Sequence, residues 1–273
     1  QPGHSIKLMQ ANKDFSLDYL IDYYKTNTID AEGYMPIYLS EISSIQNVDN
    51  VITLTYQGFD ESLDRVIFGG EEGTGYVKVA GDNLDNIKAN DQKLNLDADS
   101  RNYFAAVGGF SKDEDVSGNK VTIDGATVGK EDGASTTAID EASFGNGDVY
   151  GGYALDAAKK ASNNEVTWKS GDIKGNIYGG YVAGKAITGE NNILNVYHSS
   201  GSSSKTIAEG KSIAGFDRMN FYLSGDVKAD SVIIDNSKAN AVKMDGVSVS
   251  LQNDPEKTLD SDFMKGDKIY LIK

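Results

Sequence analysis

The sequence predicts a mainly β fold built as a solenoid, in which short coils of chain stack on one another. A phrase of five residues, Val149-Tyr150-Gly151-Gly152-Tyr153, recurs 28 residues later as Ile177-Tyr178-Gly179-Gly180-Tyr181. In both copies a pair of asparagines begins twelve residues after the first glycine and leads into a β-type run. Repetition at such a period is the signature of stacked-repeat architectures. The composition, with 39% apolar residues and 30 Gly, suits a stack with a thin core.

Two further copies of the pattern lie earlier in the chain. Val107-Gly108-Gly109-Phe110 is followed by Asn119, eleven residues after the first glycine, and then by alternating apolar and polar residues. A weaker copy joins 50–55 to Phe68-Gly69-Gly70. Alternation with period two predicts short strands with one buried face. The glycine pairs are expected at corners, and the tyrosines are expected to stack on their counterparts one coil above.

The first segment expected along the chain is an N-terminal cap, residues 1–45. Ser16 is a candidate N-cap, and the apolar residues that follow have helical spacing, which predicts one helix over Leu17–Lys25. We expect this helix to cover the open end of the stack, because an uncapped coil would expose its core and its strand edges.

The repeat β-helix itself is expected over 46–215, with exposed excursions at 130–148 and in the Ser-rich stretch 199–204. At roughly 20 to 30 residues per coil, the chain would form about ten coils. Residues 216–273 change character, since short strands alternate with Gly and Asp turns, and they are expected to form a β-rich C-terminal module that closes the solenoid.

Charge and cysteine usage exclude several classes of function. The net charge is −15, with 41 acidic against 26 basic residues and no basic stripe, so no nucleic-acid partner is expected. The chain has no Cys, which excludes a disulfide scaffold, a thiolate metal site and a Cys nucleophile. No apolar run approaches the roughly 18 residues of a membrane-spanning helix, and we expect no signal peptide within the sequence given.

Carboxylates gather in three places: 113–115, the pair Asp97 and Asp99, and the pair Asp260 and Asp262. Such groups could hold Ca²⁺ or supply the acid and base of a polysaccharide hydrolase. None of them has the spacing of a calcium loop, and a chain with 41 acidic residues forms clusters without a functional cause. We therefore predict solvated loops, no metal site and no cofactor, and a calcium-stabilised coil remains an alternative.

The phrase Val149–Tyr153, with its downstream Asn-Asn-x-Val-Thr pattern, resembles the repeats of passenger regions in Gram-negative autotransporters. The run Phe216–Leu223, followed by Asp226-Val227 and by 265–267, is similar to the segment between such a passenger and its outer-membrane barrel. The resemblance covers 104–273. It implies a right-handed parallel β-helix, exposed at the cell surface or secreted, with an adhesive function and a part in virulence. The chain would then be a fragment, since its barrel is absent.

Four tyrosines are the candidate ligand-binding residues: Tyr150, Tyr153, Tyr178 and Tyr181. In successive coils they could present an exposed aromatic wall to sugar rings or to a partner protein, because an exposed aromatic offers apolar area and a hydroxyl. The alternative is that they stack on one another inside the coil wall.

The sequence also suggests roles for His198 and Trp168. His198 precedes two serines and could suggest a hydroxyl nucleophile with its base, but adjacency in sequence is not the geometry of a catalytic triad, so an ordinary surface loop is favoured. Trp168 is in phase with Val166 and is expected in the core.

Two classes of function follow. The first is a non-catalytic module, a spacer and adhesive surface whose partner is a host or microbial surface protein or glycan, working as a monomer. The second is a β-helix enzyme, a hydrolase or lyase acting on polysaccharide, although a fold alone does not establish an activity. We favour the non-catalytic module.

Overall fold

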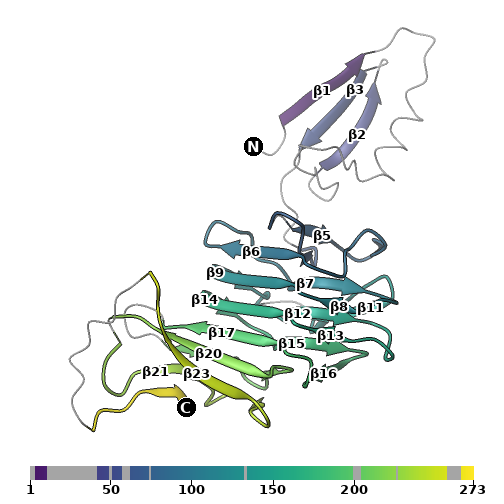
Figure 1. Cartoon of the computed structure of the whole chain (residues 1–273). Helices are drawn as coiled ribbons and strands as arrows, with labels where there is room; N and C mark the ends of the chain where they lie inside the picture. The colour runs from purple at the N-terminus through teal and green to yellow at the C-terminus, as the bar shows by residue number, and fades with distance from the viewer. Residues whose placement is uncertain are drawn as a thin grey trace. The chain divides into compact units, whose positions relative to one another are not determined.

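The computed structural model describes most of the chain in two units, residues 1–63 and 64–273 (Figure 1). The described ranges are 4–10, 42–48, 51–56, 62–73, 75–131, 134–198, 204–225, 227–256 and 266–273. The helix expected over 17–25 lies outside them.

The first unit contains a three-stranded antiparallel sheet. Its strands are β1 (His4–Gln10), β2 (Ile42–Val48) and β3 (Val51–Tyr56), in the order β1-β3-β2. The weak repeat copy placed at 50–55 is therefore wrong as a coil, because β3 pairs antiparallel with both neighbours. Only two residues separate β2 from β3, which is the connection length of a tight hairpin.

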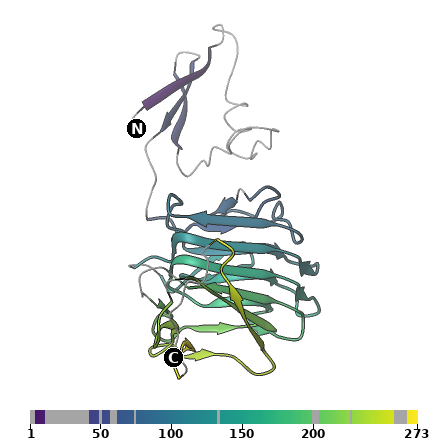
Figure 2. The same cartoon turned by 60° about the vertical axis from the view of Figure 1, so that its left-hand side comes forward.

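The second unit is a stack of parallel strands in three larger sheets and one pair of short strands (Figures 1 and 2). Sheet I contains, in parallel, β4 (Val66–Phe68), β7 (Ala105–Ser111), β12 (Val149–Ala154), β15 (Ile177–Val182), β19 (Ser212–Ala214) and β22 (Ala241–Val242). Sheet II contains β6 (Lys93–Asp97), β9 (Lys120–Val128), β14 (Glu165–Ile173), β17 (Ile193–Tyr197), β20 (Arg218–Leu223) and β23 (Ser248–Asn253). Sheet III contains β18 (Lys205–Thr206), β21 (Val232–Asp235) and β24 (Tyr270–Ile272).

Shorter strands complete this unit. Two antiparallel strands flank sheet I, β5 (Tyr76–Lys78) on β4 and β16 (Lys185–Ile187) on β15. The short strands β8 (Val116–Ser117) and β13 (Ala161–Ser162) pair in parallel. The insertion expected near 130–148 forms a hairpin of β10 (Thr136–Ile139) and β11 (Ala142–Gly145).

The repeated phrase stacks in register, which confirms the central prediction. Tyr150 lies opposite Tyr178, and Tyr153 lies opposite Tyr181, in parallel strands β12 and β15. The chain visits sheets I and II in alternation, so this unit has the architecture of a β-solenoid. Six coils are formed within the described residues, not about ten, because residues 1–63 belong to a separate unit and single coils take 25 to 30 residues or carry insertions.

The paired glycines lie inside β12 and β15, so their predicted place at corners is wrong. Their φ angles are not in the left-handed region. What requires glycine is close approach: a Cβ on Gly151 would lie 2.6 Å from the carbonyl oxygen of Gly179, and a Cβ on Gly152 would lie 2.6 Å from Nδ2 of Asn164. The pair therefore makes room for the next coil and for an asparagine.

That asparagine belongs to a buried row of side chains that joins successive coils. The N–H of Asn119 donates to Oδ1 of Asn164 at 3.2 Å, and the N–H of Asn164 donates to Oδ1 of Asn192 at 3.0 Å. The series begins with Gln92, whose N–H donates to Asn119, and ends with Asp217, whose carboxylate accepts from the N–H of Asn192 at 2.9 Å. We call these five residues the asparagine row. It satisfies buried backbone donors that would otherwise be costly.

The change of character seen in the sequence at residue 216 does not interrupt the stack. β20 pairs in parallel with β17, and β23 pairs in parallel with β20, so the strands of 216–273 add coils to the same sheets. The core runs through them continuously: Trp168 is buried, as predicted, in one cluster with Val196 and Phe221 of the following coils.

Candidate interaction surface

The four candidate tyrosines form one cluster but differ in exposure. Tyr150 and Tyr153 are 1% and 3% exposed, whereas Tyr178 and Tyr181, one coil on, are half-buried. The rings of Tyr150 and Tyr178 stack with centroids 5.3 Å apart, and those of Tyr153 and Tyr181 meet edge to face at 5.0 Å. At Tyr150 and Tyr153, therefore, the rings stack inside the coil wall, which was the alternative to an exposed aromatic wall.

The insertion hairpin accounts for this difference. Phe144 of β11 packs edge to face against Tyr150 at 6.2 Å and Tyr153 at 5.6 Å. Lys112 ties the hairpin to the stack through ion pairs with Asp140 at 2.6 Å and with Asp85 at 2.9 Å. The hairpin thus covers the tyrosines of β12 and leaves those of β15 partly open.

A buried carboxylate lies beside the tyrosines. Asp148 accepts a hydrogen bond from the hydroxyl of Tyr150 at 2.9 Å, and from the N–H and Nδ2 of Asn176 at 2.7 and 2.8 Å. Burial raises the pKa of the Asp148 carboxyl, against the effect of these hydrogen bonds. Burial, together with the nearby Asp148 charge, also raises the phenol pKa of Tyr178 and of Tyr181.

We call Asp148, Tyr178 and Tyr181 the tyrosine site. At neutral pH its phenols are protonated, so each can donate a hydrogen bond as well as offer an aromatic edge. β16 runs beside it, with Ala186 opposite Tyr181 and the exposed Lys185 opposite Val182. Half-buried aromatic rings with hydroxyl donors suit a sugar or an aromatic-rich peptide better than an ion.

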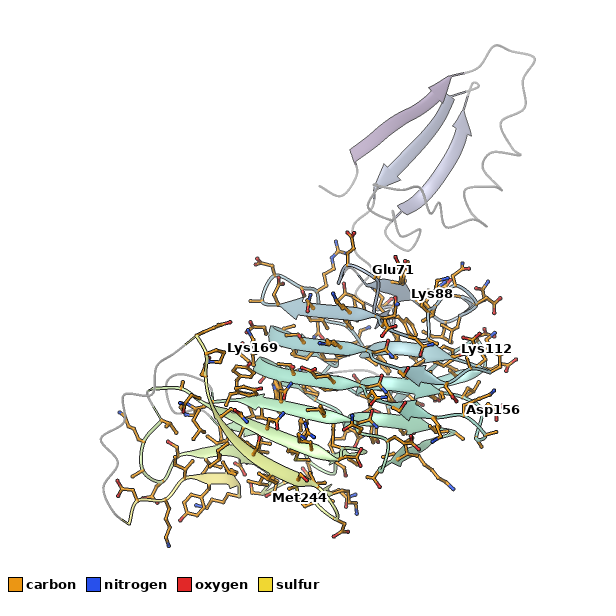
Figure 3. The ribbon with its side chains drawn as sticks, viewed as in Figure 1. Glu71, Lys88, Lys112, Asp156, Lys169 and Met244 are labelled. Carbon is orange, nitrogen blue, oxygen red and sulfur yellow. The ribbon has the colours of Figure 1, made fainter. Side chains whose placement is uncertain are left out.

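A second aromatic pair, on the outer face of sheet II, was missed by sequence reasoning. The rings of Tyr197 and Tyr222 stack face to face, with centroids 4.3 Å apart and planes at 7°. Lys169, which is labelled in Figure 3, has its Nζ 5.5 Å from the Tyr197 ring centre, and the same Nζ pairs with Glu256 at 3.2 Å. The signal was present as Asn-apolar-Tyr, which occurs at 195–197 and again at 220–222.

His198 is buried, not part of an exposed loop as expected. Its Nδ1 lies 2.6 Å from Oγ of Ser224, in the following coil, and its N–H donates to the carbonyl of Tyr222 at 2.8 Å. The two serines that follow His198 in sequence lie outside the described residues. The histidine therefore joins two coils.

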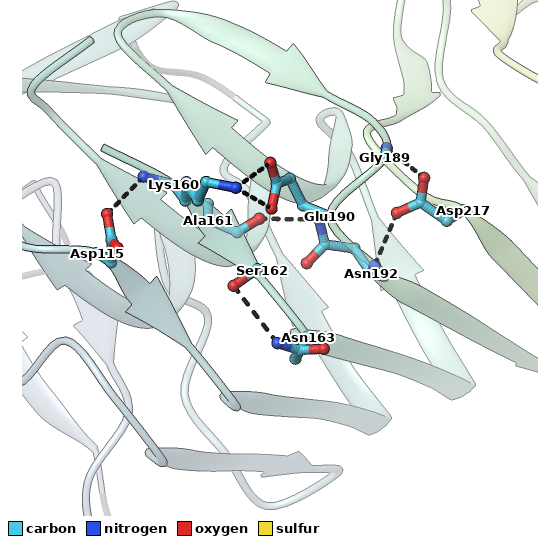
Figure 4. Close-up of polar contacts among 9 residues, drawn as sticks. All are labelled: Asp115, Lys160, Ala161, Ser162, Asn163, Gly189, Glu190, Asn192 and Asp217. Atoms are coloured by element: carbon cyan, nitrogen blue, oxygen red, sulfur yellow. Dashed lines mark hydrogen bonds and ion pairs between the residues drawn. The ribbon is translucent and has the colours of Figure 1, made fainter. Parts of the chain in front are cut away.

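The carboxylate clusters that the structure describes act in local turns and between coils. Asp97 accepts from the N–H of Asp99 at 3.1 Å, and Asp115 accepts from the N–H of Lys160 at 2.9 Å (Figure 4). Asp260 and Asp262 lie outside the described residues. Over the described ranges, no group of three or more His, Asp or Glu side chains is arranged to hold a metal ion.

No protein family, no curated protein and no solved structure matches the chain. None of the described segments forms a helix that is both long and apolar enough to cross a membrane.

Proposed function

We propose that the chain is a non-catalytic passenger module, at the cell surface or secreted, that serves as a spacer and presents an adhesive surface. Its finer architecture is a right-handed parallel β-helix, the hand that crossover connections between parallel strands almost always take. The resemblance of 104–273 to autotransporter passengers supports the location. A parent protein with an outer-membrane barrel is part of this proposal.

The observation that carries the proposal is the tyrosine site. Tyr178 and Tyr181 are held by the coil above and by each other, with ring centroids 4.7 Å apart, yet they keep part of their surface open. Rigid aromatic side chains bind at little cost in conformational entropy. We expect a glycan or a surface protein of a host or microbial cell to contact them.

The test is binding of the intact chain to panels of surface glycans and of extracellular proteins. Tyr181→Ala removes the open ring and should weaken a detected interaction at least tenfold. Tyr222→Ala is the matched control, since it removes a half-buried tyrosine from another face and should leave binding unchanged. If Tyr222→Ala abolishes binding and Tyr181→Ala does not, the tyrosine site is not the surface used.

The same samples separate binding from catalysis. Incubation with acidic and neutral polysaccharides should release neither reducing ends nor unsaturated sugar ends, the products of a hydrolase and of a lyase. Steady release of either product would replace this proposal with the enzyme alternative. Antibodies against 64–273 should label intact, unpermeabilised cells of the source organism if the module is displayed at the surface.

A further inference from the structure

The last coil exposes side chains that lie inside every earlier coil. In sheet II, Val249 lies opposite Met219 and Leu251 lies opposite Phe221. Met219 and Phe221 are fully buried, whereas Val249 and Leu251 are 47% and 59% exposed. An open groove of about 360 Å³ lies beside them, lined by Phe221, Met244, Val249 and the residues of 269–272 (Figure 3 marks Met244).

The free edge of β23 also carries unused backbone groups. The N–H of Ser248 donates to the carbonyl of Asp217, and the N–H of Asp254 donates to that of Leu223, both at 2.9 Å. Successive residues of a strand direct their N–H and C=O to opposite sides. Val249, Leu251 and Asn253 therefore point theirs away from β20, where none of the described strands pairs with β23.

This edge lacks the features by which β-sheet proteins prevent pairing between molecules. Ser248–Asn253 contains no charged residue, proline or glycine. The described residues from 227 onward, 227–256 and 266–273, include five basic and six acidic residues, a net charge of −1 compared with −15 for the whole chain. Charge repulsion therefore opposes association less at this end than elsewhere on the chain.

We propose that β23 pairs antiparallel with β23 of a second copy, about a two-fold axis through Ser250, so that the chain is a dimer and not the monomer expected from the sequence. In this register Val249 faces Leu251 of the partner subunit, and both residues offer their free N–H and C=O, so they form a hydrogen-bonded pair. Side chains of directly opposed residues lie on the same face of a sheet. Val249 and Leu251 of both copies would therefore lie over the open core, and Ser250 would lie on the outer face. The strand is thus complementary to itself.

A two-fold arrangement is favoured over a head-to-tail fibre because the other end of the stack is covered. At that end Leu94 and Leu96 of β6 are buried, and Gly70 exchanges two backbone hydrogen bonds of 2.9 Å with Lys93. A two-fold interface uses the same surface of both copies, so no surface of this kind remains free and the assembly is a dimer. This inference goes beyond the proposed function and does not depend on the tyrosine site. It concerns residues 1–273 as they stand, because a parent chain that continued the stack past Lys273 would itself cover β23.

The first test is the native mass of the intact chain by light scattering across a range of concentrations. We expect a species of twice 29.3 kDa that dissociates on dilution. Leu251→Lys places a charge on the edge and should shift the apparent dissociation constant at least tenfold towards monomer. Asn95→Lys is the control, an exposed position at the other end of sheet II, and should leave the mass unchanged. A monomer at every concentration, or a dimer that Leu251→Lys does not weaken, overturns the proposal.

The second test checks the register of the two β23 strands. Because the chain has no native cysteine, an introduced cysteine is its only thiol. Ser250→Cys would place two thiols on the axis, at a non-hydrogen-bonded position where opposed Cα atoms lie about 4.5 Å apart, within the range of a disulfide. Mild oxidation should give a covalent dimer. Ser143→Cys, an exposed serine on the hairpin, is the control. Equal cross-linking of both variants, or none of Ser250→Cys, contradicts the two-fold axis.

Discussion

The two ends of the stack differ although their strands have the same pattern. In β6 and in β23 apolar residues alternate with polar ones, and Leu96 and Leu251 occupy the same inward column of sheet II. Leu96 is 2% exposed and Leu251 is 59% exposed. At the first end the chain crosses over the edge, where Gly70 bridges to Lys93, whereas β23 is followed by no such cover among the described strands.

The difference shows what alternation specifies and what it does not. Alternation determines which face of a strand is turned inward, because successive side chains point to opposite faces. Burial depends on the layer that lies above, and each coil of a solenoid obtains that layer from its neighbour. An end coil is therefore the place where a correct strand pattern still leaves a core uncovered.

The largest expected effect compares the two ends directly. Leu96→Ala should lower the free energy of unfolding by about 3 kcal/mol, since it removes a buried side chain and leaves a cavity. Leu251→Ala should lower it by less than about 0.5 kcal/mol, since the side chain is mostly in water. Urea denaturation at a concentration where the chain is monomeric measures both. Equal losses would show that the last coil is covered in solution.

A somewhat smaller effect is expected within the asparagine row. Asn164→Ala deletes the acceptor used by the N–H of Asn119 and leaves that buried donor unpaired, which should cost about 2 kcal/mol. Asn95→Ala, at an exposed position of β6, should change stability by less than about 0.5 kcal/mol. Urea denaturation measures both variants. Similar losses in the free energy of unfolding for the two would show that the asparagine row does not hold the coils in register.

The pH dependence of stability tests whether the carboxyl of Asp148 is buried. Burial raises the pKa of Asp148 above its ordinary value of 3.8, so the folded protein binds this proton more tightly than the unfolded chain. Protonated Asp148 therefore stabilises the folded protein. This contribution to the free energy of unfolding is fully present below pH 3.8 and is lost as the pH rises through the pKa that Asp148 has in the folded state. As the pH is raised from below 3.8 through the folded-state pKa of Asp148, the free energy of unfolding, measured by urea denaturation, should fall less for Asp148→Asn than for the unsubstituted chain. A steeper fall in the variant would contradict the sign.

The smallest effect is expected for an ion pair on the surface between coils. Lys160 Nζ donates a hydrogen bond to Glu190 at 3.1 Å (Figure 4). The Lys160 side chain is 61% exposed. Exposed pairs contribute little, so Glu190→Gln should cost less than about 0.5 kcal/mol and the cost should vanish in high salt. A loss above 1 kcal/mol would mean that this pair is shielded from water.

The sequence was sufficient to predict the parallel stack where the period is regular. The 28-residue spacing places Tyr150 on Tyr178, and the buried Trp168 follows from its phase with Val166. The C-terminal coils were harder to recognise because their spacing varies, from 25 residues between β17 and β20 to 30 between β20 and β23. A fixed-period search cannot follow such changes in connection length.

The rest depended on contacts between residues distant in sequence. The glycine pairs looked like turn signals, yet their cause is the carbonyl and asparagine that approach from other segments. Tyr150 and Tyr153 looked available, yet Phe144 of the hairpin covers them. Composition and periodicity carry no information on which insertion folds back over which coil.

The solenoid requires strands β14 and β17 to pair in parallel, with Glu165 opposite Ile193 and Thr167 opposite Asn195. Paired cysteines in the Cys-free chain test this directly. Glu165→Cys with Ile193→Cys should form an intramolecular disulfide under mild oxidation, read by mass spectrometry, because neighbouring strands lie about 4.8 Å apart. Glu165→Cys with Tyr197→Cys should not, since four residues of strand separate them. The reverse result would mean antiparallel strands and no solenoid.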